Sequence, residues 1–167
     1  KIVSEASLEG FYYKPRVDID ELKKYSDGII ALSACLAGDI SQALMDRNYE
    51  KAKNIALQYR DIFGEGNFYL EIQDHGLPEQ KEVNAALVKL SKEINIPLVA
   101  TNDIHYVNKE DSKIHDVLMC IQMGKTVNDP NRMRFGSDEF YLKSREEMEK
   151  LFPYAPGAID NTVKIAE

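Results

Sequence analysis

The sequence predicts an α/β fold in which parallel strands alternate with helices. Short apolar stretches of strand length occupy residues 29–32, 68–72 and 97–101. Longer segments, at residues 49–63 and 78–94, space their apolar residues three and four apart, which is typical of helices with one buried face. Strands separated by helices of this length form right-handed βαβ units, and such units pair their strands in parallel.

The first elements of the chain are short. Asp18 is a suitable N-cap for a helix that runs through Tyr25, because its carboxylate can accept hydrogen bonds from the first helical N–H groups. Gly28 then allows the backbone to change direction before the first strand, residues 29–32. Cys35 follows the end of that strand.

The two long helices have clear ends. The first, residues 49–63, stops at Gly64. Its apolar face consists of Ala52, Ile55, Ala56, Tyr59 and Phe63. The second begins at Pro78, which suits a first helical turn, and it ends at Asn95 and Pro97. Its apolar face consists of Val83, Ala86, Leu87, Leu90 and Ile94.

Beyond the third strand the regular alternation ends. A further helix carries an apolar stripe formed by Ile114, Val117, Leu118 and Ile121. A polar loop follows at residues 126–136, and residues 140–142 are predicted to form a short strand. Ser144 and Glu147 have the spacing of a capping box at the start of the next helix, and a last helix is predicted at residues 158–167.

Length and composition indicate one globular domain over residues 1–167. Hydrophobic residues make up 44% of the chain and charged residues 29%, with no apolar run long enough to cross a membrane and no signal-peptide pattern. We therefore expect a cytoplasmic location. The net charge of -7 opposes a DNA-binding groove within this chain, so DNA would be held by other parts of a larger protein. Because the chain starts at Lys1, directly before an apolar stretch, we expect it to be a fragment of that larger protein.

A candidate metal site follows the third strand. The apolar run that ends at Ala100 leads into Asp103 and His105, which are two residues apart and would share a face in an extended chain. Cys35 and residues 71–75 follow the other two strands, so all three strand ends should meet at one edge of the sheet. A thiolate, a carboxylate and an imidazole together favour Zn²⁺ or a similar transition ion over Mg²⁺ or Ca²⁺.

These candidate ligands also have simpler interpretations. Asp103 and His105 could belong to a turn, since Asn-Asp is a common turn dipeptide. Cys35 could be a small buried hydrophobic residue, and Cys120, which lies within the apolar helical stripe, is expected to pack in the core. Spacing alone leaves both interpretations open for Asp103, His105 and Cys35.

The remaining histidines and the loop arginines are weaker candidates. We expect His75 in a turn and His115 on a solvated flank of its helix. Arg132 and Arg134 could contact phosphate, but arginines in a polar loop are more often simply solvated.

Five segments of the chain together form a longer pattern. They are GFYYKPR at residues 10–16, LSACLAG at 32–38, YLEIQDHG at 69–76, ATNDIHY at 100–106 and FYLK at 140–143. In this order they resemble successive motifs of the PHP (polymerase and histidinol phosphatase) domain of bacterial DNA polymerase III alpha subunits. The resemblance implies a distorted seven-stranded (β/α)7 barrel, of which residues 1–167 are the C-terminal portion.

The same resemblance implies a set of metal ligands. By matching positions, Cys35 is the thiol ligand of the family's metal cluster, and Asp103 and His105 are its closing pair. The family's opening His-x-His pair and its other histidine and glutamate ligands would lie upstream of Lys1. We therefore expect the chain alone to bind Zn²⁺ or Mn²⁺ weakly or not at all. We also expect it to self-associate, because missing strands would expose the edges of its sheet.

The resemblance further implies a role in DNA replication. The parent enzyme would be a DNA-directed DNA polymerase, a nucleotidyltransferase that uses Mg²⁺ for polymerisation in domains outside this chain, and the isolated chain is expected to be inactive. The PHP domain itself would either perform metal-dependent 3′–5′ exonuclease proofreading or support the polymerase structurally. The implied partners are DNA, held by other domains, and the other replicase subunits: sliding clamp, exonuclease subunit and clamp loader. No membrane partner is expected.

Two other functions remain open from the sequence. A free-standing PHP phosphoesterase, acting on a small ester such as histidinol phosphate, would use the same ligands but should lack the segments at residues 11–16 and 140–143. A non-catalytic interaction module is the other alternative, and the presence of Cys35, Asp103 and His105 weighs against it.

Overall fold

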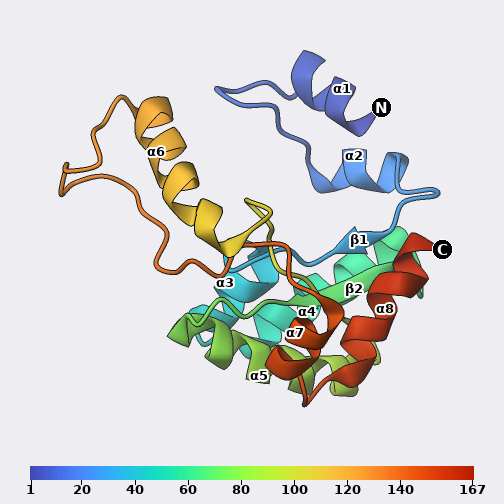
Figure 1. The fold of residues 1–167 in the computed structure, drawn as a ribbon. Coiled ribbons are helices and arrows are strands. Elements are labelled where there is room, and N and C mark those ends of the chain that lie inside the picture. Colours follow the sequence, from blue (N-terminus) through green and yellow to red (C-terminus); the bar gives the residue numbers. More distant parts are fainter.

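The computed structural model describes residues 1–167 and contains a parallel sheet of three strands (Figure 1). The strands are β1 (Ala31–Leu32), β2 (Phe68–Ile72) and β3 (Leu98–Ala100), and β2 lies between the other two. The predicted parallel α/β fold is therefore confirmed. β1 and β3 are shorter than predicted, because only the last two residues of the first segment and the central three of the third pair with β2.

Three helices cover one face of the sheet: α3 (Asp39–Met45), α4 (Tyr49–Phe63) and α5 (Pro78–Ile94). The bounds of α4 and α5 are those predicted. Each ends at a residue with a positive φ, 87° at Gly64 and 53° at Asn95, which takes the backbone out of the helix. The short helix α3 was not predicted from the sequence.

The hydrophobic core lies between this face of the sheet and the helices. Alternate residues of β2 point toward the helices, as strand geometry requires. The core contains 16 buried residues: Ile40, Ala43, Ala52, Ala56, Phe68, Leu70, Ile72, Val83, Leu87, Leu90, Ile96, Ala100, Phe152, Ala155, Ala158 and Ile159. The intervening β2 residue, Glu71, belongs to the opposite face, which is polar toward the carboxyl end of the strands.

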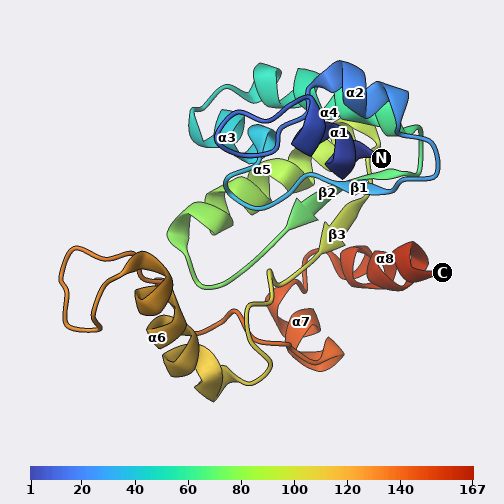
Figure 2. The same ribbon diagram turned by 90° about the horizontal axis from the view of Figure 1, so that it is seen from above.

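The last helix, α8 (Pro156–Ala166), lies alongside β3 (Figure 2). Asn161 donates a hydrogen bond from Nδ2 to the Leu98 carbonyl at 2.7 Å. This bond occupies an acceptor at the edge of the sheet that has no further strand beside it.

The capping box predicted for α7 (Arg145–Leu151) is confirmed. Ser144 Oγ accepts a hydrogen bond from the Glu147 N–H at 3.3 Å, and Glu147 Oε2 accepts one from the Ser144 N–H at 2.8 Å. Two otherwise unpaired backbone donors are satisfied in this way, which fixes the start of the helix.

The segment at residues 103–139, called the arm below, extends away from the sheet and its helices (Figures 1 and 2). It contains the turn η1 (Lys109–Asp111) and the helix α6 (Ser112–Met123). The predicted helix is present, but the stripe expected to be buried is not: Ile114, Val117, Leu118 and Ile121 are 46 to 71% exposed. No helix or strand packs closely against α6 apart from η1, so nothing covers that face.

Two other predictions for this part of the chain had different outcomes. Cys120 is buried, as expected. The short strand predicted at residues 140–142 is wrong, because the segment makes only a single parallel bridge, between Tyr141 and Tyr106. Too few backbone groups of the two segments face each other to build a ladder.

At the N-terminus, α1 (Ile2–Leu8) and α2 (Ile19–Lys24) contribute nothing to the main core. The predicted N-cap is confirmed, since Asp18 Oδ1 accepts hydrogen bonds from two N–H groups of α2 at 3.0 and 2.9 Å. The Tyr25 hydroxyl donates to Glu5 Oε1 at 3.0 Å and so connects the two helices.

The three strands form an open sheet rather than a closed barrel. None of the helices combines the length and the apolar character needed to cross a membrane.

Candidate functional site at the carboxyl edge of the sheet

The three strands end at one edge of the sheet, and the predicted site residues follow those ends. Cys35 comes after β1, His75 after β2, and Asp103 and His105 after β3. Because the strands are parallel and adjacent, their carboxyl ends lie on the same side of the sheet.

Asp103 and His105, separated by Ile104, are both exposed in the segment that leaves β3. Asp103 has a φ of 42°, in the left-handed region, which an aspartate tolerates better than most residues. His105 Nδ1 lies 2.7 Å from the Asp103 carbonyl oxygen. A carbonyl can only accept, so Nδ1 carries the proton, and in the neutral ring Nε2 keeps a free lone pair.

This arrangement of His105 fits a metal ligand. Metal-binding histidines generally donate their second ring N–H to a carbonyl or a carboxylate, which fixes the tautomer and aims the other nitrogen. Asp103, two residues before His105, is also exposed. The pair thus offers one nitrogen and one oxygen ligand of types that Zn²⁺ accepts.

Cys35 is not gathered with this pair. It is half-buried and lines a cavity of about 10 Å³ together with Glu71, Gln73 and Asn84. No group of three or more histidine, cysteine, aspartate or glutamate side chains in residues 1–167 is placed to hold a metal ion. By geometry, this chain alone therefore presents a pair of candidate ligands and a separate thiol, and the assignment of Cys35, Asp103 and His105 as one ligand set stays a prediction.

A polar network lies between the cavity at Cys35 and the end of β3. Gln73 Nε2 donates to Glu71 Oε1 at 2.9 Å and to Thr101 Oγ1 at 3.1 Å, and the Thr101 hydroxyl also donates to Glu71 Oε1. On the other side, the Glu71 N–H donates to Ser33 Oγ at 2.8 Å. The network therefore joins all three strand ends.

His75 lies in a bend after β2, as the turn prediction expected, but it is also buried, which the sequence did not indicate. Its side chain is 1% exposed. Nε2 lies 2.9 Å from the Asn102 carbonyl oxygen, and Nδ1 lies 2.8 Å from Gln80 Nε2. Gln80 Oε1 accepts the His75 backbone N–H at 2.7 Å, which fixes the orientation of that amide.

These contacts determine the protonation of His75. The carbonyl can only accept and the amide NH₂ group can only donate, so the ring is neutral with its proton on Nε2. Burial lowers the pKa of His75, and the charge of nearby Lys143 lowers this pKa further. The ring also stacks on Phe140, with centroids 3.9 Å apart and an interplanar angle of 16°.

The Asn102 side chain connects the end of β3 to residues 139–141. Its Nδ2 donates to the Glu139 carbonyl at 2.9 Å and to the Tyr141 carbonyl at 2.7 Å. The His105 N–H donates to the Phe140 carbonyl at 2.9 Å. The segment bearing Asp103 and His105 is therefore fixed from the inside by residues 139–141.

Two lysines stabilise the segment at residues 139–143. Lys109 and Lys143 both pair with Glu139, the latter at 3.1 Å, and the hydrogen bond from Lys109 is the main cause of a lowered pKa at Glu139. The Lys143 side chain is almost fully buried, so its charge is neutralised inside the protein.

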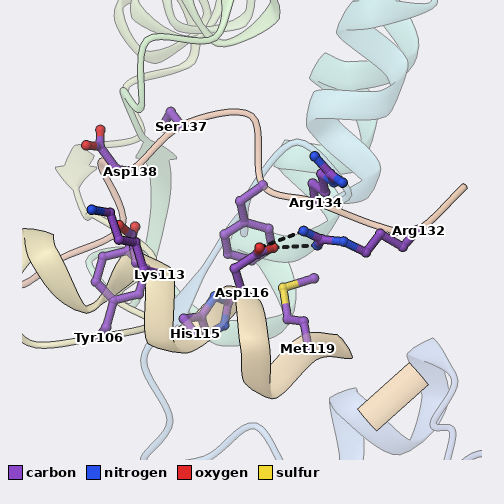
Figure 3. A pocket seen from close by; sticks show the side chains of 11 residues that line it. Tyr106, Lys113, His115, Asp116, Met119, Arg132, Arg134, Ser137 and Asp138 are labelled. Atoms are coloured by element: carbon purple, nitrogen blue, oxygen red, sulfur yellow. Dashed lines mark hydrogen bonds and ion pairs between the residues drawn. The ribbon is translucent and has the colours of Figure 1, made fainter. Parts of the chain in front are cut away.

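A second polar region lies on the arm, in a pocket of about 280 Å³ (Figure 3). Arg132 points across this pocket at Asp116 and donates to both of its carboxylate oxygens, at 2.5 and 2.6 Å. These hydrogen bonds lower the pKa of Asp116. Arg134 donates to the carbonyls of Val127 and Asp129, at 3.0 and 3.3 Å.

Arg132 thus differs from both interpretations of the sequence, whereas Arg134 is exposed, as the solvated interpretation expected. The Arg132 side chain is 2% exposed and its charge is paired, so it is neither solvated nor free to bind phosphate. Both arginines instead hold the loop at residues 126–136 in place. His115, expected to be solvated, is half-buried, with its ring centroid 5.0 Å from that of Phe135.

Sequence reasoning missed the buried polar partners of the site, Gln80, Asn84 and Asn102. One signal was present: Gln80 and Asn84 are polar residues at helical spacing on the same side of α5 as Val83 and Leu87. Polar residues on an apolar face must find hydrogen bonds, and here they pair with the segment after β2.

Comparison with known proteins agrees with the motifs. Residues 1–75 match the PHP domain family. The whole chain is 48% identical, over 167 residues, to the DNA polymerase III subunit alpha of Borreliella burgdorferi. The corresponding protein of Treponema pallidum is 48% identical over 164 residues, 98% of the chain, and that of Deinococcus radiodurans is 45% identical over 170 residues, 100% of the chain.

The chain is homologous to a segment of DNA polymerase III alpha subunits. The resemblance inferred from the five motifs is thereby confirmed. The chain spans only 13 to 14% of the length of these DNA polymerase III alpha relatives. Cys35 lies within the residues matched by the PHP family, and Asp103 and His105 lie in the remainder, where the similarity to the alpha subunits continues.

Proposed function

We propose that this chain is part of the PHP domain of a replicative DNA-directed DNA polymerase, a nucleotidyltransferase that acts in DNA replication. The observation that carries the proposal is the 48% identity to a DNA polymerase III alpha subunit over all 167 residues. A free-standing phosphoesterase is disfavoured, because that similarity includes residues 11–16 and 140–143.

The test is template-directed DNA synthesis by the full-length protein that contains this chain. We expect nucleotide incorporation that depends on Mg²⁺ and on a primed template, and none from residues 1–167 alone, since polymerisation would belong to other domains. A full-length protein that folds, binds Mg²⁺ and incorporates no nucleotide would contradict the proposal.

In the full-length protein, Cys35, Asp103 and His105 would contribute ligands to a divalent metal site, with Zn²⁺ or Mn²⁺ as the fitting ions. Support comes from the fixed tautomer of His105, whose Nδ1–H is held by the Asp103 carbonyl and whose Nε2 is free. A bound metal would supply a Lewis acid and an activated water for attack on a phosphodiester. The remaining ligands would come from residues outside this chain.

This metal site is tested by metal content. The full-length protein with Asp103→Ala and His105→Ala should retain less Zn²⁺ or Mn²⁺ than the unaltered protein after dialysis. Asp74→Ala, at the end of the neighbouring strand and half-buried, is a matched control that should retain the full amount. Equal metal content in all three proteins would contradict the assignment.

Structural support of the polymerase is the second candidate role, and the separation of Cys35 from Asp103 and His105 favours it. A 3′–5′ exonuclease assay on the full-length protein distinguishes the two roles. If Asp103→Ala abolishes excision and spares synthesis, the domain proofreads; if excision is unchanged, the domain is a support.

We also propose that the open sheet is part of a distorted (β/α)7 barrel. The helices α3 to α5 cover one face, as they would on the outside of a barrel, and the other face carries Glu71, Gln73 and Thr101, which suits an interior that leads to a site. Further strands would continue the sheet at its free β1 edge. A crystal structure of the full-length protein would test this, and a sheet limited to β1, β2 and β3 would contradict it.

The proposed partners follow from the same assignment. They are DNA bound by other domains, the sliding clamp, the exonuclease subunit and the clamp loader, in a cytoplasmic replicase. Co-purification of these subunits with the tagged full-length protein would test the set.

A further inference from the structure

The inference concerns His75 and rests on the proposed metal site at Asp103 and His105. His75 is the one histidine of the chain that is fully buried, and both of its ring nitrogens are hydrogen-bonded. A buried polar side chain with all its partners in place specifies the geometry of its surroundings, because any other arrangement leaves unpaired groups.

His75 connects three parts of the chain. Its backbone belongs to the segment after β2, its Nε2–H bonds the Asn102 carbonyl at the end of β3, and its ring stacks on Phe140. Gln80, on α5, fixes the ring from the other side through Nδ1 at 2.8 Å. The ring is therefore held in one orientation and one tautomer.

The Asn102 carbonyl precedes Asp103 directly, so the His75 bond acts where the candidate ligands begin. The Asn102 amide is also fixed, because both of its N–H bonds are used by the carbonyls of Glu139 and Tyr141. Its Oδ1 is buried without a partner, which shows that the amide is oriented by its donors alone. Asp103 then leaves this anchored residue with a positive φ of 42°.

We propose that His75 is a positioning residue for the metal site: its Nε2–H···O=C bond to Asn102 fixes the backbone from which Asp103 and His105 project. His75 does not touch the metal in this scheme. It acts through Asn102, as groups behind metal ligands commonly do, and loss of such a group typically weakens metal affinity by about tenfold to 100-fold.

The experiment compares His75→Gln with His75→Asn in the full-length protein. A glutamine places its amide nitrogen near the position of the histidine Nε2 and can still donate to the Asn102 carbonyl, whereas the shorter asparagine cannot reach it. Co²⁺ is the probe, because its visible absorption reports both the affinity and the geometry of the site. Leu90→Ala on α5 is the control for general loss of stability, since Leu90 lies in the core and takes no part in these hydrogen bonds.

We expect His75→Asn to bind Co²⁺ about tenfold or more weakly, with shifted absorption bands, while His75→Gln and Leu90→Ala resemble the unaltered protein. Unchanged binding in His75→Asn would overturn the inference. Equal weakening in His75→Asn and His75→Gln, or in all three variants, would overturn it too, because the bond to Asn102 would not be the cause.

The paired variant Asp103→Ala with His105→Ala separates the inference from the function on which it rests. If this variant binds Co²⁺ normally, the proposed site is wrong and the role of His75 falls with it. If it loses Co²⁺ while His75→Asn does not, only the positioning role is wrong. Should His75→Asn fail to fold, Gln80→Leu replaces it: this change frees the His75 ring to rotate, and unchanged Co²⁺ affinity would then overturn the inference.

Discussion

Helix α5 of the sheet unit and helix α6 of the arm have the same kind of amphipathic pattern, yet their apolar residues have different surroundings. Leu87 and Leu90 of α5 are at most 1% exposed, whereas Leu118 and Ile121 of α6 are 57 and 71% exposed. The pattern determines that a helix forms and which of its faces is apolar. Whether that face is covered depends on what else the fold places beside it.

The two regions also differ in what holds them. The sheet unit is stabilised by a contiguous apolar core, while the arm is held by ion pairs and hydrogen bonds such as Arg132 to Asp116 and Lys109 to Glu139. We therefore expect the sheet unit to respond to changes of side-chain volume and the arm to changes of charge.

The largest effect is expected from Leu90→Ala. It creates a cavity in the core and should lower the free energy of unfolding by about 2 to 5 kcal/mol. Leu118→Ala removes the same side-chain atoms from the exposed face of α6. It should change the free energy of unfolding by less than about 0.5 kcal/mol. Urea titration measures the free energy of unfolding of both variants. A similar loss of free energy in the two would show that the apolar face of α6 is covered in solution.

The protonation of the buried His75 ring should make the free energy of unfolding depend on pH. Its pKa is lowered in the folded protein, so the unfolded chain binds the extra proton first as the pH falls below the ordinary value of about 6.5. The stabilisation is complete above that pH and decreases as the pH falls toward the folded pKa, by at most about 1.4 kcal/mol per pH unit. His75→Gln should remove this part of the slope. An identical slope in the variant would show that the ring is already charged or exposed.

A smaller change is expected from Ser144→Ala, which removes the side-chain cap of α7. The cost should be about 1 kcal/mol, since one N–H group of the first turn loses its acceptor. Ser4→Ala, at an exposed position of α1, is the control and should change the free energy of unfolding by less than about 0.5 kcal/mol. Thermal unfolding of the two variants measures both values.

The smallest effect on global stability is expected from Asp116→Asn. The change removes the charge that pairs with Arg132, so the loop at residues 126–136 should open more often. We expect amide hydrogen exchange there to become faster by about tenfold or more, with no change in β2 or α5. Faster exchange throughout the sheet unit would show that the arm and the sheet unit unfold together.

Much of the sheet unit was predictable, because its signals are local. Pro78, Gly64 and Asn95 mark the ends of α4 and α5, and β2 combines aromatic and β-branched residues. The short helix α3 was missed, since a single apolar turn gives little periodicity. Residues 140–142 were predicted to form a strand because this apolar triplet has the composition of a strand. In the structure they contribute only the bridge between Tyr106 and Tyr141.

The site was predictable only in part. The spacing of Asp103 and His105 identifies them as a pair at a strand end, and the motifs add Cys35. The burial of His75 was not predictable, because the sequence around it, Gln73-Asp74-His75-Gly76, has the composition of a turn. Its partners Gln80 and Asn102 come from other elements, so only the folded chain brings them together.

The hydrogen bond from Asn161 to the Leu98 carbonyl limits the ways in which copies of this chain can pair through their sheets. It occupies an acceptor that an added strand would need on the β3 side, whereas no side chain bonds the backbone of Ala31 or Leu32 on the β1 side. Growth into a fibre requires two available edges on each molecule. With one edge blocked, two copies that join through β1 complete a closed pair and leave no edge for a third.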